Sequence, residues 1–308
     1  MDPEKLTAGH RDALQALGAD SVTREVVVRM RTIGIEPVLL KGPVTAAWLY
    51  PHELRSYNDS DLLVHPDRQD EAAQALRQIG FRHLETGESV NEKDDHSRTF
   101  VRGGAEVDLH HGLSGTHVSA GTAWSLLTRD LSSLEVSGLE MTTLGPVART
   151  LHIVLHAADS GGKAERTRAD LDRAMAATPQ SLWAEIVELA RGLEAMPAFV
   201  AGLRQVPSGA ALLATLQVHE SPTPYHLLRA ANDVPAALGV ARLLSLPVAR
   251  WPGELVREVA PSPAFMRLWS PLARRGKAGL ALAYAYRPLW LLGRLPAAYA
   301  AYRRARQH

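Results

Sequence analysis

The sequence predicts an α+β fold, in which a mixed sheet flanked by helices is followed by an all-helical C-terminal domain. Short apolar runs bounded by glycine, proline and polar residues predict strands up to about residue 145, and from Pro146 onward apolar residues recur at helical spacing. At 308 residues the chain also exceeds what one compact core usually holds. We therefore expect two domains, 1–145 and 146–308, with the break placed by the change of pattern alone.

The first expected element is a helix over residues 4–34, where apolar side chains recur at roughly helical spacing until Gly34. The nearly continuous apolar run 37–41 predicts a central strand, and Gly42 and Pro43 then turn the chain into a helix over 44–50. A strand over 59–64 follows, and then an amphipathic helix that starts at Pro66 and stops at Gly80.

Glycines predict the next turns. Gly103 and Gly104 permit the positive φ angles of a tight turn, so residues 99–102 and 105–110 are expected to form a hairpin. A smaller pairing of 134–137 with 139–143 is expected across Gly138. Helices are then expected near 147–158, 163–176, 181–193, 208–218 and 233–244.

The composition, with 46% hydrophobic and 22% charged residues, is that of an ordinary globular protein and gives no sign of disorder. The formal net charge of +1 hides a gradient, because acidic residues gather around the aspartate motifs while 267–306 is rich in arginine. A uniform nucleic-acid-binding surface is therefore not supported. The absence of cysteine excludes disulfides, thiolate catalysis and cysteine-ligated zinc.

Two segments bear on location. Residues 1–6 lack the basic start and apolar run of a signal peptide, and the lack of cysteine fits a reducing cytoplasm. The apolar stretch 278–302 is broken by Arg287-Pro288 and by Arg294-Leu295-Pro296, and no uninterrupted apolar run reaches about 20 residues. We expect helices there, no membrane span, and a cytoplasmic protein.

Three aspartates carry most of the functional information. Side chains alternate along a strand, so Asp59 and Asp61 must point to the same side of their sheet, and Asp108 would add a carboxylate from a neighbouring strand. Oxygen ligands of this kind suit Mg²⁺, the ion that orients and neutralises a nucleoside triphosphate. A lone Asp-x-Asp is weak evidence, since the same spacing recurs at Asp170 and Asp172 in a predicted helix, where residues two apart diverge.

Lys41 and Gly42 follow the first expected strand and precede a helix. Such a junction offers a phosphate the backbone donors and the positive dipole end of a helix, with the lysine as a point charge. The alternative is a solvent-exposed lysine at a strand end, with Gly42 needed only for the turn. These two residues alone leave both interpretations open.

The motifs are more informative together than alone, because they occur in one order along the chain. That order is Leu-Leu-Lys-Gly at 39–42, Arg55 with Asp59-x-Asp61, Gly80-Phe81, and Val-Asp-Leu-His at 107–110. Over roughly residues 25–175 the chain resembles a bacterial nucleotidyltransferase family of the DNA polymerase beta-type superfamily. His156 and Asp170 match a histidine and an Asp-Leu in the helical region of that family.

The resemblance implies a mixed sheet flanked by helices, two Mg²⁺ ions, and transfer of a nucleoside monophosphate from an NTP to an acceptor with release of pyrophosphate. It implies that Asp59 and Asp61 hold the ion that bridges the triphosphate, while Asp108 completes the second ion site and helps to deprotonate the acceptor. Many members of the superfamily have Gly-Ser where this chain has Lys41 and Gly42. The serine contact to phosphate is then absent, and Lys41 is its natural substitute.

Arg55 and His110 are the remaining candidates for nucleotide contact. Arg55 lies four residues before Asp59 and could bind a phosphate oxygen bidentately, or be a loop arginine bonded to nearby carbonyls. His110 shares its strand face with Asp108 and Glu106, so it could orient a carboxylate or contact the nucleotide.

His152 and His156 lie four residues apart, the spacing that zinc sites use on a helix. No acidic residue of the metalloprotease pattern lies between them, and the chain has no cysteine. We therefore interpret them as core or surface histidines.

The C-terminal stretch 284–306 combines tyrosines and Trp290 with arginines. It could dock a partner or an anionic surface through an aromatic and basic face. We interpret it as a core-packing helix with a solvated basic end, because aromatic residues at helical spacing usually pack internally.

The sequence thus predicts a Mg²⁺-dependent nucleotidyltransferase that uses an NTP, with residues 146–308 shaping the site for a small-molecule, peptide or protein acceptor. Two alternatives use the same residues: a phosphotransferase with a different cleavage point, and a non-catalytic nucleotide-binding module. Three carboxylates that repel one another without metal argue against the module. Nucleic acid is not the favoured acceptor, and the residues specify neither the NTP base nor the oligomeric state.

Overall fold

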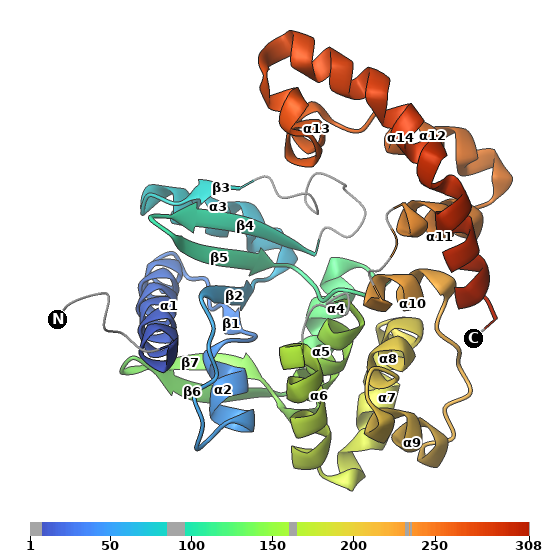
Figure 1. Cartoon of the computed structure of the whole chain (residues 1–308). Helices are drawn as coiled ribbons and strands as arrows, with labels where there is room; N and C mark the ends of the chain where they lie inside the picture. Colours follow the sequence, from blue (N-terminus) through green and yellow to red (C-terminus); the bar gives the residue numbers. More distant parts are fainter. Residues whose placement is uncertain (1–7, 85–95, 160–164, 232–233, 235, 308) are drawn as a thin grey trace. The chain divides into compact units, whose positions relative to one another are not determined.

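The computed structural model describes residues 8–84, 96–159, 165–231, 234 and 236–307. These residues fall into two compact units. The helices and strands of the chain are labelled in Figure 1. The first unit contains 8–84, 96–153 and 170–195, and the second contains 154–159, 165–169 and the described residues from 196 onward. The predicted domain break near residue 145 stays a prediction.

The first unit is built on a mixed sheet, as predicted. In the described residues the sheet has seven strands in the order β3-β4-β5-β2-β1-β7-β6. β2 with β5 and β1 with β7 are parallel pairs, and the other neighbours are antiparallel. The strands are β1 Val38–Leu39, β2 Asp59–Leu63, β3 Arg82–His83, β4 Ser97–Arg102, β5 Ala105–His110, β6 Leu131–Val136 and β7 Leu139–Leu144.

The helices account for most of the remaining described chain. The first seven are α1 Ala8–Arg31, α2 Pro43–Leu49, α3 Gln69–Gln78, α4 Ala120–Leu127, α5 Pro146–Asp159, α6 Glu165–Ala177 and α7 Trp183–Gly192. The others are α8 Met196–Leu203, α9 Pro207–Thr215, α10 Pro224–Ala231, α11 Ala237–Ser245, α12 Trp251–Val259, α13 Pro263–Trp269 and α14 Gly276–Ala305. The expected helix starts at residues 4, 163 and 233 lie outside the described residues.

One sheet face is closed by α1, which packs against β2, β5 and α3. The core beneath it includes Leu62 from β2 and Val107 from β5. Thr23 on α1 is hydrogen-bonded to Ser60, so Ser60 also faces this helix. Because side chains alternate along a strand, Asp59 and Asp61 point to the opposite face of the sheet.

The C-terminal helix corrects one expectation. The prolines at 288 and 296 were expected to break the stretch, but α14 runs through both as one helix of 30 residues. Each proline removes a backbone donor, yet its φ angle suits a helix. Packing of α14 against α11, α12 and α13 stabilises the continuous form. No helix in the described part of the chain has the length and apolar character needed to cross a membrane.

Candidate active site

Parallel pairing of β2 and β5 brings the predicted aspartates together. Asp61 lies directly opposite Asp108, and Asp59 lies opposite Glu106. One potential ligand atom from each of Asp61, Asp108 and His110 lies within 4.8 Å of the others. Asp59 is on the same sheet face but outside this close group of described residues. The structure therefore groups His110 with the two facing aspartates.

Asp61 is the centre of the site, and its side chain is only 2% exposed. Lys41 Nζ donates to Asp61 Oδ1 at 2.9 Å, and His110 Nε2 lies 2.9 Å from the same oxygen. Asp61 Oδ2 is buried and has no hydrogen-bond partner among the described residues. A buried carboxylate oxygen without a partner is costly. The free oxygen and the oxygen-rich surroundings fit a divalent cation.

The pKa shifts of the site residues also fit a divalent cation. Burial favours a higher pKa for Asp61, but Lys41 and His110 outweigh it and hold this pKa well below its usual range. Burial raises the pKa of Asp59, and the charges of Asp61 and Asp108 raise it further. Burial also lowers the pKa of His110, which favours its neutral form. Lys41 offsets part of the negative charge, and a divalent cation would offset more.

The hairpin of β4 and β5 adds a residue that the sequence analysis missed. Thr99 lies opposite Asp108, and its hydroxyl donates to Asp108 Oδ1 at 2.6 Å. The sequence contains the information needed to predict this pair, because a turn at Gly103 and Gly104 pairs residue 102 with 105. Counting back along both strands then pairs 99 with 108.

Gly42 is held in a conformation that side chains rarely adopt, with φ 58° and ψ −112°. A Cβ atom at Gly42 would lie 3.2 Å from Cδ2 of Tyr57. The Tyr57 hydroxyl donates to Asp20 Oδ1 at 2.9 Å, which fixes the ring beside Gly42. The turn after β1 therefore requires glycine, and this turn places Lys41 on Asp61. Phosphate binding by Lys41 and Gly42 stays a prediction.

Arg55 has a partner that neither sequence-based interpretation named. Its Nη2 donates to Asp170 Oδ2 at 2.7 Å and its Nε to Asp170 Oδ1 at 3.1 Å. Tyr50 donates to Asp170 Oδ1 at 2.7 Å. The Arg55 and Asp170 side chains are 11% and 3% exposed. This buried pair ties the segment that leads into β2 to helix α6.

Both histidines of the 152 and 156 pair lie on helix α5. His152 is buried and His156 is partly exposed. The close group of potential metal ligands in the described chain contains neither of them. Asp170 and Asp172 lie on helix α6, as the sequence predicts, and Asp170 binds Arg55.

A family model described as "Uncharacterised nucleotidyltransferase" matches residues 4–208 of the chain. The chain belongs to this nucleotidyltransferase family. The matched region contains every described strand and all the predicted site residues. The predicted enzyme class, a transferase, is therefore confirmed, and the family implies an NTP substrate.

Other comparisons are more distant. No curated protein matches the chain. The solution structure of the antibiotic-resistance factor ANT(2'')-Ia is similar with a TM-score of 0.39 and 14% identity, over 68% of this chain and 100% of that chain. An antigenic nucleotidyltransferase-like protein from Paracoccidioides brasiliensis is similar with a TM-score of 0.34 and 14% identity, over 59% of this chain and 92% of that chain.

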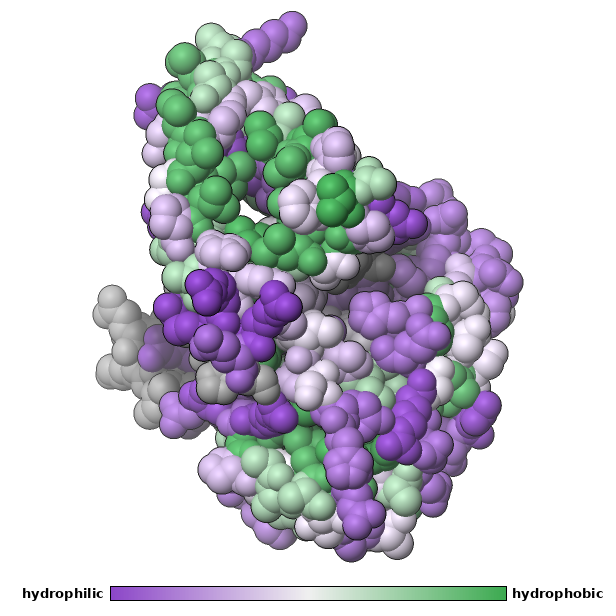
Figure 2. All heavy atoms as spheres, turned by 90° about the vertical axis from the view of Figure 1, so that its right-hand side faces the viewer, coloured by the Kyte–Doolittle hydropathy of each residue, from purple (hydrophilic) through white to green (hydrophobic). Residues whose placement is uncertain are grey.

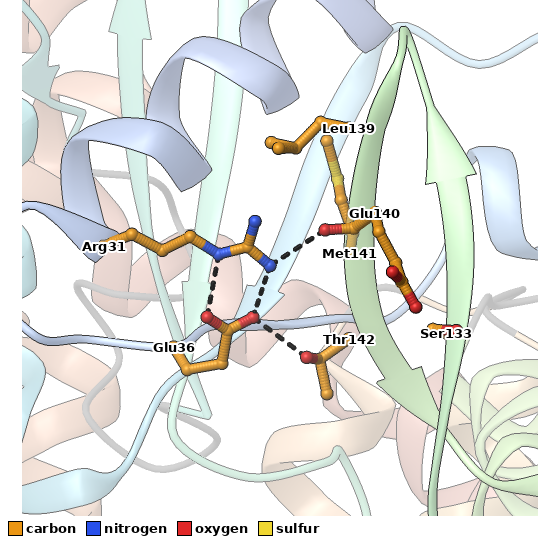
Figure 3. Close-up of a pocket in the computed structure, with 7 residues that line it drawn as sticks. All are labelled: Arg31, Glu36, Ser133, Leu139, Glu140, Met141 and Thr142. Atoms are coloured by element: carbon orange, nitrogen blue, oxygen red, sulfur yellow. Dashed lines mark hydrogen bonds and ion pairs between the residues drawn. The ribbon is translucent and has the colours of Figure 1, made fainter.

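This nucleotidyltransferase also has a hollow of about 380 Å³ beside β7 (Figure 3). Arg31 donates to both carboxylate oxygens of Glu36, at 2.8 and 2.7 Å, and Thr142 donates to the same carboxylate at 2.9 Å. The charges of Arg31 and Glu36 satisfy each other, and the second carboxylate of the lining, that of Glu140, is exposed. The hollow therefore lacks a buried carboxylate oxygen without a partner, which is the feature that marks Asp61. Its lining residues are Arg31, Glu36, Ser133, Leu139, Glu140, Met141 and Thr142.

Proposed function

We propose that this nucleotidyltransferase transfers a nucleoside monophosphate from an NTP to a small-molecule, peptide or protein acceptor in a Mg²⁺-dependent reaction that releases pyrophosphate. The observation that supports this proposal most directly is the pairing of Asp61 with Asp108 in register on parallel strands. One oxygen of Asp61 is buried without a partner among the described residues, and Asp59 shares the sheet face. Carboxylates in this arrangement are suited to Mg²⁺.

In this proposal Asp59, Asp61 and Asp108 hold the metal. Bound Mg²⁺ would neutralise the triphosphate and stabilise the charge that develops during transfer. Since Mg²⁺ prefers oxygen ligands, His110 serves to orient Asp61 through the 2.9 Å contact with Oδ1. Lys41 restrains the same oxygen, which leaves Oδ2 available.

The proposed transfer forms one bond to phosphorus and breaks one. The acceptor oxygen forms a bond to the α-phosphorus of the NTP, and the bond from that phosphorus to the oxygen bridging the β-phosphate breaks. Pyrophosphate leaves with the electron pair of the broken bond, and the acceptor proton passes to the Asp108 carboxylate. Thr99 supports this role because its hydroxyl donates to Oδ1 of the same carboxylate and so restrains its orientation.

The test is transfer of label from each α-³²P-labelled NTP, with Mg²⁺ and a metabolite and peptide extract. We expect Asp61→Asn and Asp59→Asn each to reduce transfer by roughly a hundredfold or more. Asp67→Asn is the matched control, because the Asp67 side chain is 86% exposed and lies just beyond β2. It should leave transfer unchanged.

The alternatives give different results. Transfer of label from γ-³²P-labelled NTP, with none from the α-labelled form, would identify a phosphotransferase. Calorimetric binding of NTP and Mg²⁺ without any transfer across the acceptor mixture would favour a binding module. If no NTP binds at all, the assignment of the aspartates is wrong.

A further inference from the structure

Helix α14 presents a broad apolar face to solvent. Six large apolar side chains along it are between 48% and 66% exposed, namely Leu282, Tyr286, Leu289, Leu292, Leu295 and Tyr299. At about 100° per residue these positions fall within one half of the helix circumference. Figure 2 shows hydrophobic surface, in green, gathered at the top of the view, where Figure 1 places α13 and α14.

The opposite side of α14 is occupied by the rest of its own unit. Ala283, Arg287 and Ala301 are buried there. Arg287 Nε donates to the Glu258 carbonyl at 2.6 Å, and the Tyr284 hydroxyl donates to the Pro261 carbonyl at 2.6 Å. These contacts fix the rotation of the helix about its axis. The leucines of the outer half are therefore held outward by the packing of the inner half.

The charges near this face have one sign. The chain has no acidic residue after Glu258, while its last 50 residues contain nine lysines and arginines. Lys277 at one end of α14 is exposed, and so are Arg303, Arg304 and Arg306 at the other end. On the helical wheel these four residues lie in the same half as the exposed leucines. The outer face is thus an apolar stripe with basic groups at both ends.

We propose that this outer face of α14 binds the surface of an anionic lipid bilayer. The helix would lie in the plane of the interface, with its leucines and tyrosines entering the boundary between headgroups and acyl chains. The basic residues at both ends would contact anionic headgroups. Aromatic and long basic side chains suit this boundary because each has an apolar body and a polar end.

The charges favour lipid over a second copy of the chain as the occupant. In a two-fold dimer through this face, Lys277 and the arginines at 303–306 would meet only the same basic groups of the partner. No acidic residue lies on α14 to pair with them. An anionic membrane supplies both the apolar phase and the opposite charge.

The test is flotation of the full chain with vesicles of about three parts phosphatidylcholine to one part phosphatidylglycerol, compared with pure phosphatidylcholine. We expect binding to the anionic vesicles that weakens as salt is raised. The double variant Leu289→Ser/Leu292→Ser should weaken binding about tenfold or more. Its matched control is Leu14→Ser/Leu17→Ser on α1, where the leucines are 52% and 62% exposed. The control should bind like the parent chain.

A second pair of variants tests the charges. Arg303→Ser/Arg304→Ser should weaken binding by about fivefold for each charge removed. Arg11→Ser/Arg24→Ser removes two exposed arginines of α1 and should have no effect. All these residues are exposed, so the far-ultraviolet circular dichroism of each variant should match that of the parent chain.

Three results would overturn the proposal. These are failure of the parent chain to float with anionic vesicles, equal binding to neutral vesicles, and equal binding by the Leu289→Ser/Leu292→Ser variant. Light scattering after size exclusion tests the rival occupant of this face, a second copy of the chain. A concentration-dependent dimer that Leu289→Ser/Leu292→Ser abolishes, with no vesicle binding by the parent chain, would assign the face to self-association.

Discussion

The buried pair of Arg55 and Asp170 gives a sharp test of how the segment before β2 is held. Asp170→Asn keeps the shape of the side chain and an oxygen for the Tyr50 hydroxyl, but it removes the charge opposite Arg55. With side chains 11% and 3% exposed, the two charges have little water to replace the lost partner. Removing one member of such a pair typically costs about 3–5 kcal/mol of unfolding free energy. Because Arg55 retains some exposure, we expect about 3 kcal/mol.

The matching double variant separates the charge effect from general disruption. Arg55→Met/Asp170→Asn leaves no uncompensated charge, so its free energy of unfolding should lie closer to that of the parent chain than Asp170→Asn does. Glu53→Gln is the control, because the pair of Glu53 with Arg173 joins the same segment to α6 but is exposed, at 59% and 38%. It should cost less than about 1 kcal/mol.

Urea unfolding followed by circular dichroism, with linear extrapolation to zero denaturant, measures these differences. Two results would refute the reasoning. One is a loss below about 1 kcal/mol for Asp170→Asn, the size typical of a surface pair. The other is a double variant whose loss of unfolding free energy equals the sum of the losses for Asp170→Asn alone and Arg55→Met alone, since the effects of independent sites add in that way.

Three further predictions follow from the site. Gly42→Ala should cost about 1–3 kcal/mol, because φ is 58° and the new Cβ would press on Tyr57; urea unfolding measures this, and an unchanged midpoint would contradict it. Burial raises the pKa of Asp20 despite its hydrogen bond from Tyr57, so ionised Asp20 opposes folding at neutral pH and this cost disappears as pH falls through the raised pKa. Asp20→Asn should therefore raise Tm at pH 7, and the gain should shrink towards about pH 4; a constant gain would contradict the cause. Thr99→Val should weaken Mn²⁺ binding, measured by calorimetry, by about tenfold through loss of the hydrogen bond to Asp108, and Thr99→Ser should restore it; equal affinities would exclude a positioning role.

Local pattern was sufficient for much of the fold. Alternation along 59–64 and the two glycines at 103 and 104 predicted β2 and the hairpin of β4 and β5, which the structure contains. The short helix α4 was missed, since Ala120–Leu127 gives little room for a periodic signal and its start depends on the Ser119 cap. The continuous α14 was also missed, because a proline's local cost is visible in sequence while the packing that offsets it is not.

The sequence by itself determined which chemical groups are available: Asp59 and Asp61 on one strand face, Asp108 on another strand, and a Lys-Gly turn before a helix. These are consequences of residue order and of the two-residue period of a strand. Tertiary structure decided the partners. It set Lys41 and His110 on one oxygen of Asp61, and it paired Arg55 with Asp170, 115 residues away in the chain. It also left the leucines of α14 exposed. Such contacts depend on strand register and helix packing between distant segments, which local periodicity does not encode.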